Sequence, residues 1–556
     1  MKKTAITILL ALCTTGLFAQ TAYDALMLSE NSYEGTARSV AMGNAFTALG
    51  GDLGAVSINP AGSAMASYSQ ITLSPGISIA SSTAQGISPY ENGELPYFQR
   101  KLKSSLTKMD IPNLGFTMNF KTGRNHGVVS WTMGFVVNKT ADYNQDVYAN
   151  GVNSTTSFIG RMAYEASLNG YYADELGASD AYDFLPWKYV TGYQSAMFDT
   201  FEDIFVAATE KVYDDKTCFV AGELEQAYGR RTSGGKYEYL INVGMNISDY
   251  LYLGVNVGMN TINYSYEEYF KEQAVNSNDF HIELKDDQGN VVSSSYFNRM
   301  RYKSAYSLSG SGIYAKFGII ANPVKGFRIG ATLQTPTRTT IRENWEDEGE
   351  TVFTGPNGKT WSALSPYGDN TWTFRSPLKT SIGTAYTFGQ LGTVSVDYEY
   401  SNYGKLKYLS SAYTDRSTLE YINDDMMNCY GGSHNIRAGV EIKPIPAFAI
   451  RAGYNLKTSA QKAIWDDYEG DYIRLKGRDL TNKASFGLGF SSKGSFFADA
   501  ALTRTFIPRE YFMPYEDYMF TTDKNGDLIV NSNYYAPELL IKSALWKVVL
   551  TIGFRF

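Results

Sequence analysis

Apolar and polar residues alternate with a period of two along most of the chain. In the C-terminal segment 546–556 every even-numbered position is apolar, and the last residue is a phenylalanine. One such segment would also fit the sheet of a soluble protein, but recurrence of the pattern indicates lipid-facing strands of a transmembrane β-barrel. Comparable segments lie near 68–81, 111–121, 127–139, 236–248, 250–264, 304–321, 327–340, 372–388, 392–408, 433–443, 447–457, 482–491, 495–507 and 544–556. We therefore predict an all-β fold, a fourteen-stranded antiparallel barrel over residues 67–556.

The connections between these segments alternate between short and long. Short turns lie at 121–125, 248–249, 322–326, 389–392, 444–446 and 492–494. Short periplasmic turns and long outer loops are the usual asymmetry of an outer-membrane barrel. The longest link, about 141–235, contains a helix-like stretch at 201–210, so we expect it to form a folded cap.

The N-terminus reads as an export signal. Lys2 and Lys3 precede an apolar run, and Ala19 supplies a small residue at the expected cleavage site. Later in the chain no stretch of about 18 apolar residues recurs, so helical spans are not expected. Residues 1–19 are therefore interpreted as a signal peptide, and the mature protein is expected in a bacterial outer membrane.

Residues 20–66 lack the period of two. A helix-like run at 36–49 is followed by Gly50, Gly51 and Asp52 and then by 59–62. The segment is too small to fold alone, so a helical hatch inside the barrel is the simplest interpretation. Lumen-facing glycines near the short turns would leave room for another backbone. They are Gly244, Gly254, Gly258, Gly318, Gly330, Gly383, Gly439, Gly453, Gly487, Gly489 and Gly553. We expect the hatch in the periplasmic half, with a hollow ligand space above it.

The N-terminal run carries a family resemblance. Residues 35–46, 48–52 and 59–61 resemble the hatch of the FadL/TodX family of outer-membrane transport proteins, whose barrels have fourteen strands. The resemblance implies a hatch that blocks a lumen for long-chain fatty acids or other apolar molecules. It also implies a sideways exit through a gap in the wall beside a kinked third strand. The large loop after strand three departs from the simplest members.

The composition of the chain argues against several other classes of function. The chain has 49 Lys+Arg against 56 Asp+Glu and no long basic run, which argues against nucleic-acid binding. The 14% aromatic content, led by 43 Tyr, suits contact with lipid headgroups. There are three histidines, His126, His281 and His434, and no metal-ligand spacing or nucleophile motif. We expect no enzyme activity, metal or cofactor. Whether Cys218 and Cys429 form a disulfide is left open.

Two sets of residues are candidates for roles in transport. Asn59, Pro60 and Ala61 suit a gating turn or a structural turn of the hatch, because proline fixes φ and asparagine bonds local backbone. Gly134 in strand three is a candidate for the wall kink or a plain lumen-facing glycine. Candidate ligand head-group cations are Arg328, Lys379, Arg437 and Arg451. The stronger interpretation pairs these cations with the inward carboxylates Asp397, Glu399, Glu441 and Asp499.

The sequence thus predicts passive uptake of hydrophobic small molecules. Long-chain fatty acids come first because of the resemblance, followed by aromatic hydrocarbons and haem-like molecules. Expected partners are outer-membrane lipid and the barrel-assembly machinery, whose recognition signal the terminal phenylalanine resembles. The alternative is a non-transporting anchor or shuttle for secreted partners, with Trp187, Tyr189 and Tyr193 of the large loop as its docking surface.

Overall fold

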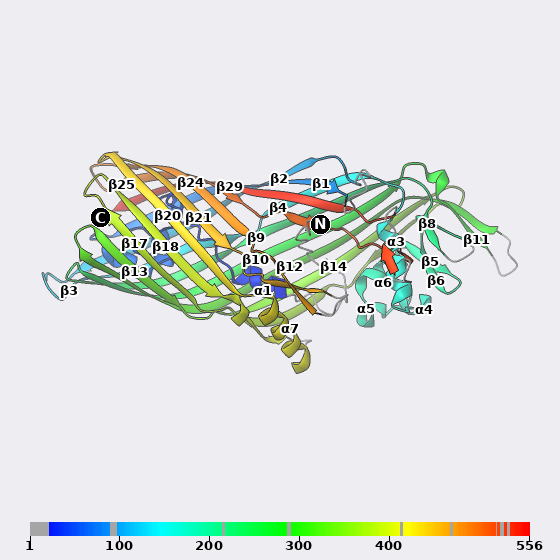
Figure 1. The fold of residues 1–556 in the computed structure, drawn as a ribbon, viewed down its shortest axis with the longest axis horizontal. Helices are drawn as coiled ribbons and strands as arrows, with labels where there is room; N and C mark the ends of the chain where they lie inside the picture. The colour runs from blue at the N-terminus through cyan, green and yellow to red at the C-terminus, as the bar shows by residue number, and fades with distance from the viewer. Residues whose placement is uncertain are drawn as a thin grey trace.

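The computed structural model describes residues 22–88, 97–213, 217–285, 291–411, 415–466, 471–518, 520–522, 528–530 and 534–556. The predicted signal peptide and its cleavage site near Ala19 lie outside these residues. The strands run obliquely along the long axis of the molecule, and the C-terminus lies at one end of it (Figure 1). That end carries the short turns, and the other end carries the helical cap.

Fourteen antiparallel strands close into a barrel through the pairing of β1 with β29. Five of the fourteen are interrupted and consist of two named strands each. In order around the wall they are β1 (Gln70–Ile87), β2 (Leu102–Lys121), β3 (Val128–Asp142) with β4 (Gln145–Asn153), β9 (Leu224–Ile247), β10 (Leu251–Ala274), β12 (Val291–Val324), β13 (Phe327–Gln334) with β14 (Arg338–Thr354), β17 (Lys379–Thr387) with β16 (Gly368–Arg375), β18 (Gly392–Asn402) with β19 (Lys407–Ser411), β20 (Gly432–Ile445), β21 (Phe448–Thr458), β24 (Leu480–Ser491), β25 (Phe496–Phe506) with β26 (Glu510–Phe512), and β29 (Glu538–Arg555). Each predicted segment overlaps one of them, so the predicted barrel is confirmed.

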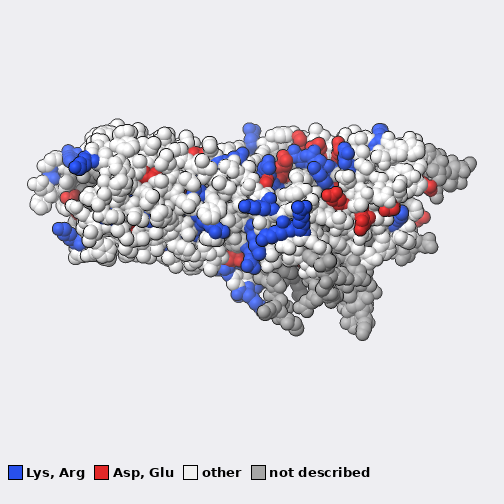
Figure 2. All heavy atoms as spheres, turned by 90° about the horizontal axis from the view of Figure 1, so that it is seen from above, with Lys and Arg blue, Asp and Glu red and all other residues white. Residues whose placement is uncertain are grey.

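An apolar belt surrounds the half of the barrel nearest the short turns. On β1 the exposed Ile71, Leu73, Ile77 and Ile79 alternate with buried positions, and β29 follows the same pattern. Large apolar side chains on the outside of a closed barrel are stable in contact with lipid chains. Seen from above, this half carries few charged side chains apart from its tip (Figure 2). Among the described residues no helix is long and apolar enough to cross a membrane.

The N-terminal hatch lies inside the barrel. It contains α1 (Ala22–Ser29), α2 (Ala37–Ala41) and the short 3-10 helices η1 (Gly54–Ser57) and η2 (Pro60–Met65). The side chain of Thr36 caps α2 by accepting a hydrogen bond from the Ser39 amide. The helix predicted over 36–49 is wrong beyond Ala41, because Gly43 and Asn44 have φ values of 63° and 58°. That left-handed backbone ends the helix after little more than one turn.

A helical cap closes the opposite end. The long link after β3 contains α3 (Phe158–Leu168), α4 (Ala173–Leu176), α5 (Ala181–Phe184) and α6 (Trp187–Gln194). Two small hairpins follow, β5 (Phe198–Phe201) with β6 (Ile204–Ala207) and β7 (Glu210–Val212) with β8 (Cys218–Val220). The predicted folded cap is present, but its helices are elsewhere. Residues 201–210 form turns and a strand, because Glu202 turns at φ 55° and an apolar β-prone run follows it.

The remaining elements lie at the loop end. They are η3 (Ser277–Asp279), β11 (His281–Lys285), β15 (Thr360–Leu364), η4 (Tyr403–Lys405), α7 (Arg416–Cys429), β22 (Ala463–Asp466), β23 (Asp471–Arg474), β27 (Phe520–Thr522) and β28 (Leu528–Val530). Cys218 in β8 and Cys429 in α7 are not joined by a disulfide.

Candidate functional site

The turn at Asn59 fixes the hatch to the barrel wall. The Asn59 side chain accepts a hydrogen bond from the Ala61 amide at 3.0 Å and so caps η2. Its amide group donates to the carbonyl oxygen of Thr47 at 2.6 Å and to that of Ile319 in β12 at 3.2 Å. Pro60 occupies the first turn of η2, where a missing N–H costs nothing. The predicted turn therefore joins two parts of the hatch to one strand.

Glycines on the inner wall receive the hatch backbone. A Cβ atom at Gly318 would lie 2.0 Å from Oδ1 of Asn59, and one at Gly254 would lie 2.3 Å from the Ala61 nitrogen. Six more of the predicted glycines face hatch atoms in the same way: Gly244, Gly330, Gly383, Gly439, Gly453 and Gly487. Gly258, Gly489 and Gly553 instead face side chains of the wall. The hatch thus fills the end of the barrel that carries the short turns.

Buried ion pairs join the hatch to strands β20, β21 and β25. Nε of Arg38 in α2 lies 2.9 Å from Glu441, which also binds Arg451 at 2.6 Å. Arg451 also forms an ion pair with Asp499, with 2.5 Å between Nη1 and Oδ1. All these groups are buried except Arg38, which is partly exposed. Removal of one partner from such a buried pair is strongly destabilising, because it leaves an uncompensated charge in the interior.

The second predicted pair of charges lies deeper in the lumen. Arg437 is fully buried, 3.4 Å from Glu399 and 3.8 Å from Asp397, with its guanidinium 5.2 Å from the centre of the Tyr33 ring. Asp397 in turn accepts a hydrogen bond from the Thr47 amide of the hatch at 2.8 Å. The expected network of inward cations and carboxylates is present, with hatch groups built into it.

The other two candidate head-group cations bind hatch backbone. Nζ of Lys379 donates to the carbonyl oxygen of Ser29 at 2.8 Å, and Arg328 donates to that of Leu49 at 3.3 Å. Two further lysines, which were not predicted from the sequence, also bind hatch backbone. Lys236 donates to the carbonyl oxygen of Leu28 at 2.9 Å, and Lys316 donates to that of Ser57 at 2.5 Å. In this conformation the predicted head-group cations all engage protein groups, and most of them hold the hatch.

The barrel wall is interrupted between strands two and three. β2 pairs with β3 from Asn113 to Lys121, whereas residues 102–110 of β2 pair with β1 alone. β4, the continuation of β3, pairs with β9 alone. In the described residues the ladder between these two strands therefore ends at the pair Asn113 and Asn138. A register shift in β3 between Lys139 and Ala141 marks the same place.

The interruption is not at Gly134. This residue pairs in register with Thr117 on one side and Asn242 on the other, and the register shifts of β3 lie elsewhere. A Cβ atom at Gly134 would lie 2.6 Å from the Thr117 side chain. Gly134 is therefore a glycine of close approach within a regular ladder, and the change in the wall begins at Lys139.

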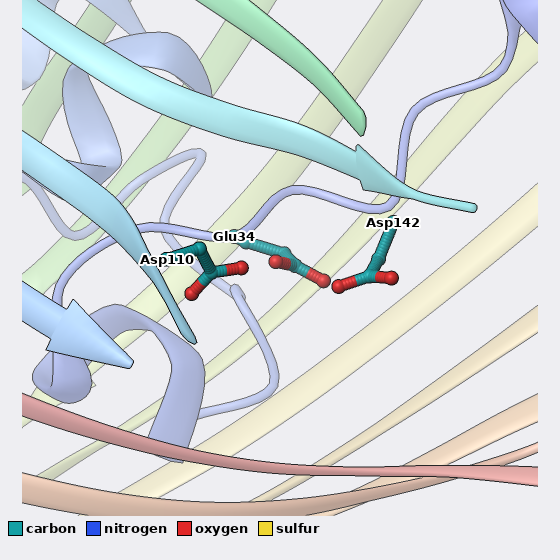
Figure 3. Close-up of side chains that lie close together, drawn as sticks. All are labelled: Glu34, Asp110 and Asp142. Carbon is teal, nitrogen blue, oxygen red and sulfur yellow. The ribbon is translucent and has the colours of Figure 1, made fainter. Parts of the chain in front are cut away.

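A charged cluster lies where the ladder ends. Glu34 from the hatch, Asp110 from β2 and Asp142 from β3 direct their carboxylates toward one another (Figure 3). Lys139 binds Asp110 at 2.5 Å and Asp142 at 2.6 Å. Lys547 of β29 binds Glu34 and, at 3.0 Å, Asp110. The carboxylates are thus largely neutralised by ammonium groups, which makes the cluster an ionic tie between hatch and wall.

Hatch backbone reinforces this tie. The amide of Glu34 donates to the carbonyl oxygen of Lys139 at 2.9 Å, and that of Ser32 donates to Thr140 at 2.7 Å. The hatch thus covers the point at which β3 departs from regular pairing. Alternation in β29 places Lys547 on the inward face, but nothing in the sequence around Glu34 indicates its partner. Only the path of the hatch brings these residues together.

Packed side chains occupy the described part of the lumen above the hatch. Ala25, Leu26 and Leu28 of α1 pack against an aromatic set from the wall and loops. That set consists of Trp372, Phe374, Tyr403, Tyr408 and Tyr430. Beyond it the cap core fills the outer end with further aromatic side chains. A cavity of about 200 Å³ lies on the other side of the hatch, lined by Arg38, Glu441 and Arg451 among others. Side chains of α1 and of the aromatic set therefore occupy the described part of the lumen in which the sequence predicted an open ligand space.

The predicted docking surface on the large loop is also not exposed. Trp187 and Tyr189 are 9% and 4% exposed. Trp187 packs against Trp345 of β14 with ring centroids 5.7 Å apart, and its indole N–H donates to the Tyr182 carbonyl oxygen. Tyr193 is half-buried against Phe198 and Phe205. These rings stabilise the cap because large aromatic side chains bury the most apolar area.

A closed barrel with an apolar belt, a tied hatch and a capped mouth defines a plugged transmembrane β-barrel. No family model and no curated protein matches the sequence. Among solved structures, the chain is similar to a FadL homologue of Pseudomonas aeruginosa at 10% identity, covering 95% of this chain and 99% of that chain with a TM-score of 0.48. It is likewise similar to the P. putida toluene transporter TodX at 14% identity, covering 94% and 99% with a TM-score of 0.47.

Proposed function

We propose that the protein is a FadL/TodX-type channel for uptake of hydrophobic small molecules across a bacterial outer membrane. The observation that carries the proposal is the position of Glu34. This hatch residue is tied to Lys547 at the point where the ladder between β2 and β3 ends. A plug tied at a wall interruption suits a gate that opens sideways, because movement of one segment would uncover both the lumen and the exit.

The aromatic set beneath α1 is the proposed binding site. Trp372 and Tyr408 stack with ring centroids 4.8 Å apart, and Leu26 and Leu28 belong to the same buried cluster. A pocket for an apolar ligand needs apolar walls and few polar groups. Withdrawal of α1 would expose such walls within the lumen. The ligand would then replace leucine side chains, so little new polar surface would be buried.

The class of cargo is proposed from the sequence resemblance. Long-chain fatty acids are the first candidates, and monoaromatic hydrocarbons and haem-like molecules follow. Lys236 and Lys379 bind carbonyl oxygens at the end of α1, the helix that packs against the aromatic set. If α1 withdraws, these ammonium groups become available for a carboxylate, a step that would favour a fatty acid. Export by a signal peptide cleaved near Ala19 and insertion by the barrel-assembly machinery belong to the same proposal.

A reversible cross-link tests the gate. The Ala37 amide donates to Oγ1 of Thr551 in β29 at 2.7 Å, so Ala37→Cys with Thr551→Cys can join the hatch to the wall in a background with Cys218→Ser and Cys429→Ser. In cells without other uptake channels we expect labelled oleate or toluene uptake to stop on oxidation and to return on reduction. Each single cysteine variant is the control. Equal uptake in both redox states would refute movement of the hatch.

Loosening the hatch tests the same gate in the opposite direction. Asn59→Ala with Pro60→Ala removes the cap of η2 and two donated hydrogen bonds. We expect altered uptake from a barrel that still shows heat-modifiable migration in SDS gels. Unchanged uptake would limit Asn59 and Pro60 to a structural turn.

The filled lumen favours one alternative, a barrel that anchors secreted partners without transport. Because Trp187 and Tyr189 are buried, that function would need a surface other than the one predicted from the sequence. Mass spectrometry of organic extracts separates the two functions. A specific acyl or aromatic species, absent from an unrelated barrel prepared in parallel, supports transport. An empty extract with a stoichiometric co-purifying protein supports the anchor.

A further inference from the structure

Three cations form a row across the outer face of the barrel. Arg338 of β14 lies directly opposite Arg375 of β16, which lies directly opposite Lys407 of β19. All three side chains are exposed, and their sequence neighbours Thr339, Phe374 and Tyr408 point inward and are buried. Directly opposed positions on adjacent antiparallel strands have Cβ atoms about 5 Å apart. Like charges at such positions repel one another, so the row calls for an anion.

The described residues do not supply that anion. On its other side Arg338 faces Ile313 of β12, which is 65% exposed. Within the described ranges, neither an ion pair nor a hydrogen bond involves the side chain of Arg338, Arg375 or Lys407. Two other outward cations do have carboxylate partners. Lys303 binds Glu267 at 3.1 Å, and Arg231 binds Asp146 at 2.9 Å.

The row lies at the edge of the apolar belt farther from the short turns. On the membrane side of the row the wall exposes Leu333, Leu378 and Tyr400. Beyond it β14 continues to Thr354 toward the cap. With the short turns in the periplasm, this edge is level with the headgroups of the outer leaflet. Basic side chains at that level attract anionic lipid headgroups.

We propose that the row of Arg338, Arg375 and Lys407 binds the phosphate of a phosphorylated glycolipid in the outer leaflet. The arginine fork binds phosphate oxygens in pairs, and lysine adds a point charge. The acyl chains of the same lipid lie against Ile313, Leu333 and Leu378, which free phosphate cannot contact. The bound phosphate neutralises the repulsion within the row and fixes a lipid over the outside of the wall that carries Trp372 and Tyr408.

The test uses the full barrel in a neutral detergent. Bisphosphorylated lipid A is titrated and followed by native mass spectrometry, beside its dephosphorylated form and inorganic phosphate. The variant is Arg338→Gln with Arg375→Gln and Lys407→Gln. Lys303→Gln, which removes a paired outward cation, is the matched control. We expect the triple variant to bind lipid A at least tenfold more weakly and the control to bind within twofold of the wild type.

The other outcomes of this experiment also decide whether the proposal holds. Binding within twofold in the triple variant overturns the proposal, as does equal binding of the dephosphorylated lipid. Competition by millimolar inorganic phosphate would replace the lipid with free phosphate and also overturn it. Thermal unfolding without lipid checks the fold, and because repulsion is removed we expect a Tm equal to or above that of the wild type. If the triple variant does not fold, the binding of lipid A to the single variant Arg375→Gln is measured and compared with the wild type instead. None of these outcomes depends on which molecule the channel transports.

Discussion

Arg38 of the hatch donates to Glu441 of β20 over 2.9 Å, and this contact joins a segment near the N-terminus to the tenth strand of the wall. Glu441 also forms an ion pair with Arg451, so a single carboxylate binds two guanidinium groups. The hatch therefore depends on a wall carboxylate whose second partner, Arg451, is itself bound by Asp499. This coupling ties the hatch to three strands of the wall through one chain of charges.

Removal of this carboxylate should loosen the hatch. Glu441→Gln leaves Arg38 and Arg451 without their shared charge, and the loss of one partner in a buried pair costs about 3 kcal/mol. We expect faster hydrogen exchange over residues 36–66 and unchanged exchange in β1 and β29. Glu420→Gln, which removes the exposed pair with Arg416 on α7, is the matched control and should change neither. Equal protection of the hatch in Glu441→Gln would contradict this role.

A methyl group on the inner wall should displace the hatch. At Gly318 the new Cβ atom would lie 2.0 Å from Oδ1 of Asn59, so Gly318→Ala forces the turn away from β12. We expect proteolysis within residues 43–62 while the barrel stays heat-modifiable. Gly477→Ala has no heavy atom within 4 Å of its Cβ and should behave as wild type. Resistance to protease in Gly318→Ala would show that the hatch adjusts without leaving.

Helix α1 should compete with apolar ligands for the aromatic set. Leu26→Ser with Leu28→Ser removes the two leucine side chains that α1 contributes to the cluster of Trp372 and Tyr408, at a cost of about 2–4 kcal/mol for each leucine in the docking of α1. We expect tighter binding of an apolar fluorescent probe to the purified barrel. Met27→Ser, which alters a half-buried neighbour on the same helix, should have a smaller effect. Weaker binding in the double variant would instead place α1 within the binding site as a supporting wall.

The cap should lose stability as pH rises through neutrality. Burial raises the pKa of Glu210 to about 7, and the nearby Glu272 carboxylate adds to the rise, outweighing hydrogen bonds from the Ala207 amide and the Tyr518 hydroxyl. A carboxyl whose folded pKa is raised contributes stability below its unfolded pKa, and that contribution is lost as pH rises through the folded pKa. The window therefore runs from about pH 4.5 to about pH 7.

Hydrogen exchange of residues 157–213 measures this effect after correction for intrinsic rates. We expect several-fold faster opening of the cap at pH 8 than at pH 5. Glu210→Gln should remove most of the difference, because glutamine keeps the shape and does not ionise. Asp183→Asn, an exposed acid on α5, is the control and should retain the pH dependence. A pH dependence that persists in Glu210→Gln would assign it to Glu272 instead.

The period-two pattern was sufficient to predict the wall. Ile71 to Ile79 on β1 and Val548 to Phe554 on β29 face lipid as alternation requires, because neighbouring strand residues point to opposite faces. The short turns and the hatch glycines were readable for related reasons. Gly318 and Gly254 sit on inward positions where only a second backbone explains the absence of a side chain. Alternation also placed Arg437 and Arg451 on the same face as their carboxylate partners.

Helix predictions in the hatch and the large loop were less accurate, because local propensity does not fix where a chain turns. Gly43 and Asn44 end α2 with left-handed backbone, and Glu202 turns the chain where a helix was expected. The filling of the lumen had no local signal at all. Leu26 and Leu28 are ordinary apolar residues until the path of the chain brings them against Trp372.

The sequence by itself determined the strands, their inward and outward faces and the site of the hatch, since each depends on periodicity within a short window. Tertiary structure decided which charges meet. Glu34, Asp110, Asp142, Lys139 and Lys547 come from four separate elements, and only closure of the barrel around the hatch places them at the end of the ladder between β2 and β3. The row of Arg338, Arg375 and Lys407 likewise depends on register, because a shift of one residue would turn any of them to the other face.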